Sequence, residues 1–347
     1  MQIYDKKYGV YMATAVNRQA TGLVGTNTKT RPKRHRSISY EKWGYFFIAP
    51  FFIVYAVASL YPLLTTFTYG FFERYQVLGQ DMHNEFIGLE NFKNLFSTPD
   101  VAKFAGNTFL MWVIGFIPQI FLSLLLASWF TDLRLKLKGT GFFKVVIYLP
   151  NVIMAAAMSF LFWALFGDTG PINQMIVERT GSIFQFMVSV PATRLIISGI
   201  NFLMWFGNTS IMLMAAINGI DTSLYEAASI DGANSRQTFW KITMPLIRPI
   251  LLYVIVTSLI GGLQMFDIPN IMTRGAGGTD RTAMTLVMYL NNFLSGTRDY
   301  GMAGALSIIL FIVGGILSLI VFYGMRDKDA ASDAKKKRAL RRNRGVI

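Results

Sequence analysis

Six long apolar segments divide the chain, and polar stretches separate them. The apolar segments cover residues 44–67, 107–130, 142–166, 194–217, 250–272 and 302–325. A helix that crosses a bilayer needs about 20 mostly apolar residues, and it satisfies its backbone hydrogen bonds within the segment. The pattern therefore predicts an all-α integral membrane protein with six transmembrane helices, which form one domain over residues 44–325.

Lys and Arg residues gather at the two ends of the chain, in residues 1–43 and 326–347. The first group is Lys6, Lys7, Arg18, Lys29, Arg31, Lys33, Arg34, Arg36 and Lys42, and the second is Arg326, Lys328, Lys335, Lys336, Lys337, Arg338, Arg341, Arg342 and Arg344. The short loop after the second apolar segment adds Arg134, Lys136 and Lys138. Cytoplasmic loops of membrane proteins carry such an excess of basic residues. We expect both termini to be cytoplasmic, as a basic arm and a basic tail near anionic lipid headgroups.

The composition agrees with a membrane protein, since 53% of the residues are hydrophobic and only 15% are charged. Soluble domains carry about 25% charged residues. The net charge of +14 belongs to the basic ends and loops and does not indicate a nucleic-acid partner. Cysteine is absent, and the two histidines, His35 and His83, lie far apart. We therefore expect no metal site, no cofactor in this chain and no catalytic residues.

One polar insert, 226-EAASIDGANSRQTFWKITMPLIRP-249, follows the fourth apolar segment and is therefore predicted to be cytoplasmic. Ser223 and Glu226 have the spacing of a capping box, which predicts a short helix over residues 224–230. Asp231 and Gly232 should end that helix, because glycine permits the backbone conformation of a sharp turn.

A second short helix is expected after this turn, with Asn234 and Gln237 as its cap. Pro245 and Pro249 should end it and start the fifth span. The insert, residues 221–249, would then hold two short helices that lie flat at the membrane face. A plain amphipathic helix resting among headgroups is the alternative, and it would explain Phe239 and Trp240.

The insert also matches a family signature, E-A-A-x-x-D-G-A-x-x-x-x-x-F-x-x-I-x-x-P-x-x-x-P, at every defined position. The matching residues are Glu226, Ala227, Ala228, Asp231, Gly232, Ala233, Phe239, Ile242, Pro245 and Pro249. In this stretch the chain resembles the permease subunits of ATP-binding-cassette importers. The resemblance implies that the first short helix docks into a cleft of a separate ATPase subunit, which binds ATP and Mg. The residues expected to make this coupling are Glu226, Ala227, Ala228, Asp231, Gly232, Ala233, Phe239 and Pro245.

Further short matches, over residues 88–92, 148–150, 266–267 and 300–303, resemble the carbohydrate (maltose-type) branch of that family. The resemblance covers residues 44–325 and lacks the extra leading spans and large external domain of the longer maltose subunit. The resemblance implies that the protein imports a sugar of the oligosaccharide class across a bacterial cell membrane. The implied partners are an ATPase dimer, a second permease subunit that is a different chain, and an extracytoplasmic binding protein.

Polar side chains within the fourth and fifth apolar segments are candidates for the sugar pathway. Asn201, Trp205 and Asn208 are spaced by four and three residues, and Gln264, Asp267 and Asn270 by three and three. Each set would share one helix face, and amide, carboxylate and aromatic groups suit a sugar. The alternative role is to hold helices together, and Asp267 could instead pair with Arg274 or Arg281.

Two other classes of protein remain open at this stage. A self-contained secondary transporter for a polar solute would normally need carboxylates inside its spans or inverted repeats, and only Asp267 fits. An integral membrane enzyme would need a catalytic cluster, which the sequence lacks. We therefore favour a permease subunit without enzymatic activity.

Overall fold

A computed structural model describes residues 41–77, 80–81, 84–132, 135 and 137–325. The predicted basic tail, His35, His83 and all but the end of the predicted basic arm lie outside these ranges. The described chain is mostly helical, as expected. Two small β-ladders depart from the all-α prediction: β1 (Phe72–Glu73) pairs with β4 (Glu85–Phe86), and β2 (Gln76–Val77) pairs with β3 (Gln80–Asp81).

Five helical stretches in the described residues are long and apolar enough to cross a bilayer. They are Lys42–Tyr69, Asp100–Thr131, Val190–Asn218, Ser235–Met272 and Tyr300–Met325. A sixth candidate is the pair Thr140–Val152 and Ala155–Thr180, which is bent by 91°. The multi-pass architecture predicted from the apolar segments is confirmed, and the number of spans is six if the bent pair counts as one.

The third predicted span, residues 142–166, is therefore not one straight helix. It consists of α5 (Thr140–Val152) and α6 (Ala155–Phe166), and the backbone between them is extended, with ψ of 135° at Ile153 and 140° at Met154. Pro150 lies in the last turn of α5, where a proline removes one backbone donor from the helix. The helix α7 (Pro171–Thr180) follows α6.

The chain divides into two compact units between Tyr55 and Ala56. The described part of the first unit is α1 (Glu41–Tyr55), whose large apolar side chains are strongly exposed, with Phe47 at 75% and Phe51 at 67%. A helix that is apolar and exposed all round is suited to lipid rather than water.

In the second unit, α4 (Asp100–Thr131) and α8 (Val190–Asn218) pack closely along their length. The Ser198 hydroxyl donates to the Met111 carbonyl oxygen at 2.9 Å, and the Ser123 hydroxyl donates to the Phe206 carbonyl oxygen at 2.9 Å. A Cβ atom on Gly115 would lie 2.9 Å from the Ser198 carbonyl oxygen. Small residues and cross-helix hydrogen bonds of this kind join helices in membranes, where lipid offers no hydrophobic driving force.

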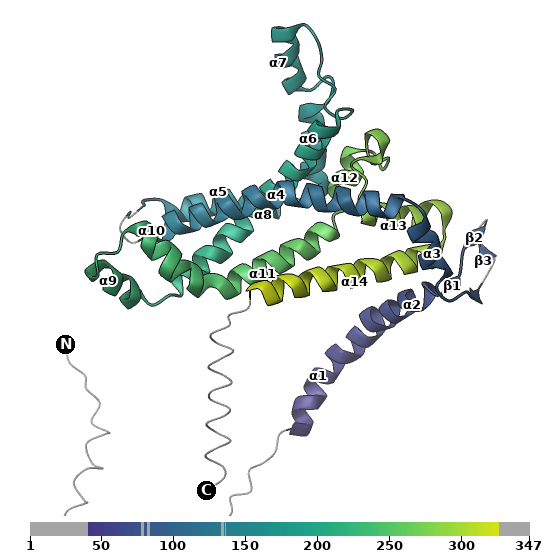
Figure 1. Ribbon diagram of the computed structural model, residues 1–347, viewed down its shortest axis with the longest axis horizontal. Helices are drawn as coiled ribbons and strands as arrows, with labels where there is room; N and C mark the ends of the chain where they lie inside the picture. Colours follow the sequence, from purple (N-terminus) through teal and green to yellow (C-terminus); the bar gives the residue numbers. More distant parts are fainter. Residues whose placement is uncertain (1–40, 78–79, 82–83, 133–134, 136, 326–347) are drawn as a thin grey trace, which may run out of the picture. The chain divides into compact units, whose positions relative to one another are not determined.

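The second unit contains further helices besides α4 to α8. They are the π-turn Ala56–Leu60, α2 (Tyr61–Tyr69), α3 (Glu90–Ser97), α9 (Thr222–Ile230), α10 (Ser235–Thr238), the π-turn η2 (Phe239–Thr243), α11 (Met244–Leu263), α12 (Asp267–Met272), the short 3₁₀ turn Thr279–Arg281, α13 (Leu286–Asn292), the π-turn Phe293–Thr297 and α14 (Tyr300–Met325). In Figure 1, α4, α11 and α14 run along the bundle, with α9 and α10 at one end and α3, α13 and β1 at the other.

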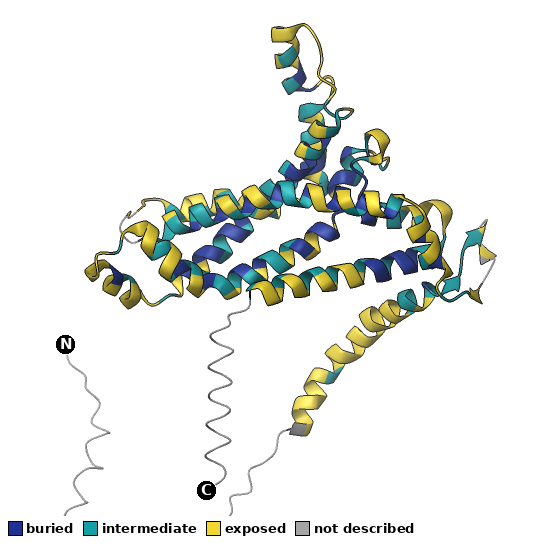
Figure 2. Cartoon of the chain, in the orientation of Figure 1, coloured by how far each residue is buried: buried dark blue, intermediate teal, exposed yellow. Residues whose placement is uncertain are grey.

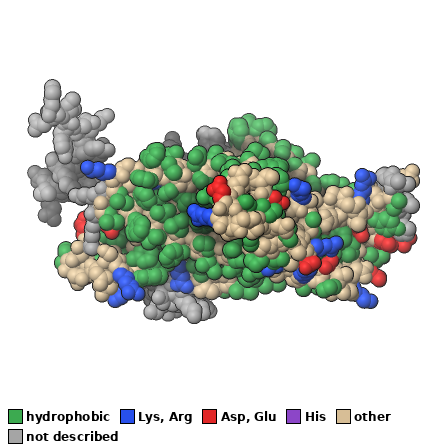
Figure 3. Space-filling view, turned by 90° about the horizontal axis from the view of Figure 1, so that it is seen from above, with side chains coloured by type: hydrophobic (Ala, Val, Ile, Leu, Met, Phe, Trp, Pro, Cys, Tyr) green, Lys and Arg blue, Asp and Glu red, His purple; other side chains and the backbone are tan. Residues whose placement is uncertain are grey.

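Three clusters of buried apolar residues fill the bundle. One joins α4, α8 and α12 through residues such as Ile197 and Met272, and a second joins α3, α4, α13 and α14 around Phe104. The third lies beneath α9 and α10 and holds Leu213 and Ile247. Figure 2 shows the buried residues along the inward sides of α8 and α11, and Figure 3 shows hydrophobic side chains over much of the face in view. The burial pattern leaves the outer apolar surface for lipid or other proteins.

Candidate functional site

The helix α9 carries the first part of the family signature, and its cap is not the predicted one. The Asp221 side chain accepts a hydrogen bond from the Ser223 backbone N–H at 2.9 Å, so Asp221 is the N-cap and Ser223 lies inside the helix. The predicted Ser223–Glu226 capping box is therefore wrong. The hydrogen bonds from Ser223 lower the pKa of Asp221 and keep its carboxylate ionised. Glu226 is thereby left free of the cap, with its side chain exposed.

The turn after α9 has the form of a glycine-terminated helix end. Gly232 has φ of +74°. The Ala233 N–H donates to the Ala228 carbonyl oxygen at 2.9 Å, and the Gly232 N–H donates to the Ser229 carbonyl oxygen at 3.2 Å. These two bonds satisfy carbonyl groups that the helix end would leave without partners. The predicted break at Asp231–Gly232 is confirmed, and only the glycine has the positive φ that it requires.

The second helix of the insert starts as expected and then continues into the fifth span. Asn234 and Gln237 form a reciprocal capping box, with bonds of 2.8 and 2.9 Å. The four-residue helix α10 passes through the π-turn η2 into α11, where Pro245 lies in the first turn and Pro249 lies inside the helix. The prediction of a separate, flat second helix is wrong, because both prolines are accommodated within one continuous helical path.

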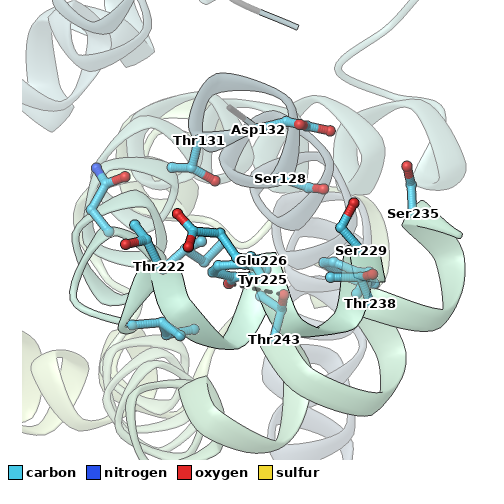
Figure 4. A pocket seen from close by; sticks show the side chains of 14 residues that line it. Ser128, Thr131, Asp132, Thr222, Tyr225, Glu226, Ser229, Ser235, Thr238 and Thr243 are labelled. Atoms are coloured by element: carbon cyan, nitrogen blue, oxygen red, sulfur yellow. Dashed lines mark hydrogen bonds between the residues drawn. The ribbon is translucent and has the colours of Figure 1, made fainter. Parts of the chain in front are cut away.

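A cavity of about 290 Å³ lies between α9, α10 and the ends of α4 and α8. Glu226 and Phe239 line it, together with hydroxyl groups of Thr131, Thr222 and Thr238 (Figure 4). On its floor, Tyr225 Oη lies 3.1 Å from Thr243 Oγ1, a hydrogen bond that ties α9 to η2. This cavity brings Glu226 and Phe239 together on the inner side of α9.

The other signature residues lie on the outer side of the insert. A second, more open hollow of about 480 Å³ is lined by Ala227, Ala228, Asp231, Gly232 and Ala233. Pro245 is exposed on the first turn of α11 and lines neither hollow. Seven of the eight predicted coupling residues therefore divide between two surfaces of one loop, and Pro245 belongs to neither.

The first predicted pathway set lies on an unbroken helix. Asn201, Trp205 and Asn208 are all in α8, so their spacing of four and three residues places them on one side of it. Trp205 is 47% exposed, and the two asparagines are partly buried. This arrangement gives the chain one exposed aromatic face flanked by two amides.

The second predicted set does not share one helix face. The helix α11 ends at Leu263, Gln264 is its C-cap, and α12 begins at Asp267 after Phe266, whose φ of −133° is not helical. The prediction of a continuous helix through residues 250–272 is wrong at this break. Gln264 and Asp267 are exposed on either side of the break, and Asn270 is partly buried in α12.

The expected ion pairs of Asp267 are also absent from the described residues. Arg281 instead lies 3.4 Å from Asp100, and the Arg274 guanidinium lies 5.0 Å from the centroid of the Trp163 ring. Asp267 therefore has no ion-pair partner in the part of the chain that the structure describes.

A polar network at the end of the bundle opposite α9 was not predicted. Arg194 Nη2 donates to Asn107 Oδ1 at 2.7 Å, and Arg194 Nε donates to the Thr282 carbonyl oxygen at 2.9 Å. Asn107 Nδ2 in turn donates to the carbonyl oxygens of Arg281 and Met284, at 3.0 and 3.2 Å. The only sequence signal was the presence of Asn107 and Arg194 at the starts of two apolar segments. No group of three potential metal-binding side chains occurs in the described residues.

The sequence of the chain is similar to those of known transport proteins. A family model described as "Binding-protein-dependent transport system inner membrane component" matches residues 108–331. The chain is 30% identical over 313 residues to the lactose transport system permease protein LacF of Rhizobium radiobacter. The aligned region covers 88% of this chain and 100% of LacF. It is also 28% identical over 303 residues to the arabinooligosaccharides transport system permease protein AraP of Bacillus subtilis, across 82% and 90% of the two chains.

Two solved structures share the fold. A chain of a bacterial transporter involved in the import of alginate has a TM-score of 0.70 and 23% identity, over 82% of this chain and 95% of that one. A bacterial alginate transporter in complex with an alginate pentasaccharide-bound periplasmic protein gives a TM-score of 0.66 at 23% identity, over 82% and 94%.

Proposed function

We propose that this chain, which belongs to the family of binding-protein-dependent transport system inner membrane components, is the permease subunit of an ATP-binding-cassette importer for an oligosaccharide. Relatives that match over most of both chains carry names that specify lactose and arabino-oligosaccharides. The exposed Trp205 and the amides of Asn201 and Asn208 on the same side of α8 suit the C–H and hydroxyl surfaces of a sugar. This side of α8 is the observation that carries the sugar assignment.

The chain acts without catalysis of its own, and a separate ATPase dimer with ATP and Mg supplies the energy. The site for that subunit is the loop 221–249. Support comes from the two ends of α9, where Leu224 in the first turn is 44% exposed and Ile230 in the last turn is 87% exposed. Apolar side chains so exposed on a short, capped helix are suited to burial in a partner. Glu226, with no hydrogen bond to its carboxylate among the described residues, is available to a basic group of that partner.

The domain consists of six spans, and both termini are cytoplasmic. Met325, the last residue of α14, packs against the apolar cluster that holds Leu213 and Ile247, so α14 ends on the side of the bundle that carries the coupling loop. The excess of Lys and Arg in the arm, in the tail and in the loop at Lys138 agrees with a cytoplasmic location of all three segments. The membrane is then the bacterial cell membrane, and lipid contacts the outer apolar surface.

A second permease, a different chain, completes the translocation pathway. Trp205, Gln264 and Asp267 are exposed on a single chain, although polar groups inside a membrane are costly unless they face protein or a water-filled cavity. A second six-span subunit would enclose them, and an extracytoplasmic binding protein would deliver the sugar at the end opposite α9.

Coupling follows from the continuous path of α10, η2 and α11. When ATP closes the ATPase dimer, α9 moves with it, and the Tyr225–Thr243 hydrogen bond and the unbroken helix carry the movement into the fifth span. The cavity between the permeases then opens outward to receive sugar, and hydrolysis reverses the movement.

The test is the ATPase activity of this chain purified with its native partners in lipid, with binding protein and a panel of oligosaccharides that includes lactose and arabino-oligosaccharides. Stimulation by one sugar class supports the proposal and identifies the substrate. If no ATPase co-purifies with this chain and an ion gradient drives uptake, the proposal would be overturned in favour of a secondary transporter.

A further inference from the structure

The break between α11 and α12 leaves backbone groups that need partners outside the helix. Within the hydrocarbon layer, a break is tolerated only where protein or a polar cavity satisfies such groups. Met265, at the centre of the break, is 6% exposed, and its carbonyl oxygen accepts a hydrogen bond of 2.8 Å from Thr285 Oγ1. Thr285 is 0% exposed, so water cannot replace this donor.

Thr285 lies in a segment that is hydrogen-bonded to α4, the helix that packs closely against α8. The Leu286 N–H donates to Thr108 Oγ1 at 3.1 Å, and Asn107 donates to the Met284 carbonyl oxygen at 3.2 Å. Thr285 Oγ1 also accepts from the Met288 N–H at 3.2 Å and caps α13. Through Thr285, the backbone of the broken span is attached to the closely packed pair of helices that carries Trp205.

We propose that Thr285 is a positioning residue for the substrate pathway. Its hydroxyl holds the break open at Met265, and thereby fixes Gln264 and Asp267, which flank Met265, at a set distance from the polar face of α8. The relevance of this position for sugar rests on the proposed function, but the geometry of the break does not.

Replacing Thr285 with valine keeps the shape of the side chain and removes the hydroxyl. The Met265 carbonyl then loses its donor in a buried site, which favours any rearrangement that gives it another one. Continuation of α11 through residues 264–266 is such a rearrangement, because each further helical turn supplies backbone donors. It would rotate Gln264 and Asp267 away from their present directions.

The natural absence of cysteine makes this movement measurable by single-cysteine labelling. Gln264→Cys and Asp267→Cys would each be labelled with a membrane-impermeant maleimide in the complete transporter in lipid, with and without Thr285→Val. Since an unsatisfied buried acceptor shifts equilibria by about tenfold or more, we expect a change of at least about threefold in both labelling rates. Thr285→Ser keeps the hydroxyl, so both labelling rates should equal those measured with the natural Thr285.

Two controls separate positioning from general loosening. Ser182→Cys lies on an exposed turn between α7 and α8, away from the break, and its labelling rate should not respond to Thr285→Val. Thr257→Val removes a hydroxyl that bonds only within α11, to Tyr253 and Val254, and should leave the rates at Gln264→Cys and Asp267→Cys unchanged. Three results would each overturn the proposal: unchanged labelling rates in Thr285→Val, equal changes at Ser182→Cys, or rates in Thr285→Ser that match those of Thr285→Val. Because labelling requires no sugar, these outcomes are independent of which solute the protein carries.

Discussion

Gly262 of α11 packs directly against the indole ring of Trp112 of α4, and a Cβ atom at this glycine would overlap the ring. The ring cannot move aside easily, because its Nε1 donates to Ser258 Oγ at 3.2 Å and its face stacks on Phe116 at 5.0 Å between centroids. The neighbouring Gly261 is exposed, and nothing lies within 4 Å of the position of its Cβ. The two adjacent glycines therefore have different roles.

Gly262→Ala should destabilise the protein by about 1–3 kcal/mol through overpacking against Trp112. Gly261→Ala is the matched control, and it should be neutral or stabilising by about 0.5–1 kcal/mol because alanine favours a helix. Thermal unfolding of both variants in the same detergent measures the difference. Equal transition temperatures would contradict the close contact between α11 and α4.

Gly232 has open space around it, so its requirement is conformational rather than steric. At φ of +74°, a side chain costs about 1–2 kcal/mol, least for asparagine. Gly232→Val should reshape the end of α9 and uncouple ATPase activity from uptake, whereas Gly232→Asn should retain more coupling. Gly141→Val, at an exposed glycine without positive φ, is the control. Equal coupling in Gly232→Val and the control would contradict the docking role of this turn.

Asn107 is 5% exposed and donates to two backbone carbonyl groups, so its loss leaves buried acceptors unsatisfied. Asn107→Ala should lower the free energy of unfolding by about 1–3 kcal/mol. Asn292→Ala, at an exposed position in α13, should change it little. The measurement is again thermal unfolding, with limited proteolysis of residues 273–285 to locate the loosened segment. If Asn292→Ala proved the more damaging of the two, the network would not stabilise this end of the bundle.

Asp299 precedes α14, and burial raises the pKa of its carboxyl group, with the neighbouring charge of Glu73 adding to the effect. The fold therefore favours the protonated form. This contribution to stability is fully present below the unfolded value of 3.8 and is lost as the pH rises through the raised pKa.

In the natural protein the Met302 N–H donates to Asp299 Oδ1 at 2.9 Å. Asp299→Asn keeps an oxygen acceptor for this N–H and carries no charge at any pH. Relative to the natural protein, the variant should be more stable at pH 7, and this advantage should shrink as the pH approaches 4. Unfolding temperatures measured between these values test the sign. An advantage that grows on acidification would show that the carboxylate, rather than the carboxylic acid, is favoured at this site.

The sequence was most informative where the structure depends on local chemistry. Hydropathy located every apolar segment, and the Asn234–Gln237 box and the Gly232 turn depend only on residues within a few positions. The cap of α9 was misassigned because Asp221, Thr222 and Ser223 are all good capping residues. The choice among them depends on where the chain leaves α8, and this is not a local property.

The break at residues 264–266 could not be predicted for a different reason. Hydropathy is continuous through it, and the donor that supports it, Thr285, comes from another helix cap twenty residues away. The bend between Ile153 and Met154 is similar, since a proline inside an apolar segment is compatible with a kinked helix as well as with a 91° turn. Interactions with other helices decide between these forms.

The π-turn Phe239–Thr243 sets the rotational phase between the coupling loop and the fifth span. A π-turn holds one more residue than an α-helical turn, and each residue of an α-helix turns the chain by about 100°. A single deletion within these five residues could therefore leave an unbroken helix and still point α9 in a different direction around the axis of α11. Insertions and deletions here would be far more disruptive than substitutions, so the length of this segment should be under stricter selection than its amino-acid identity.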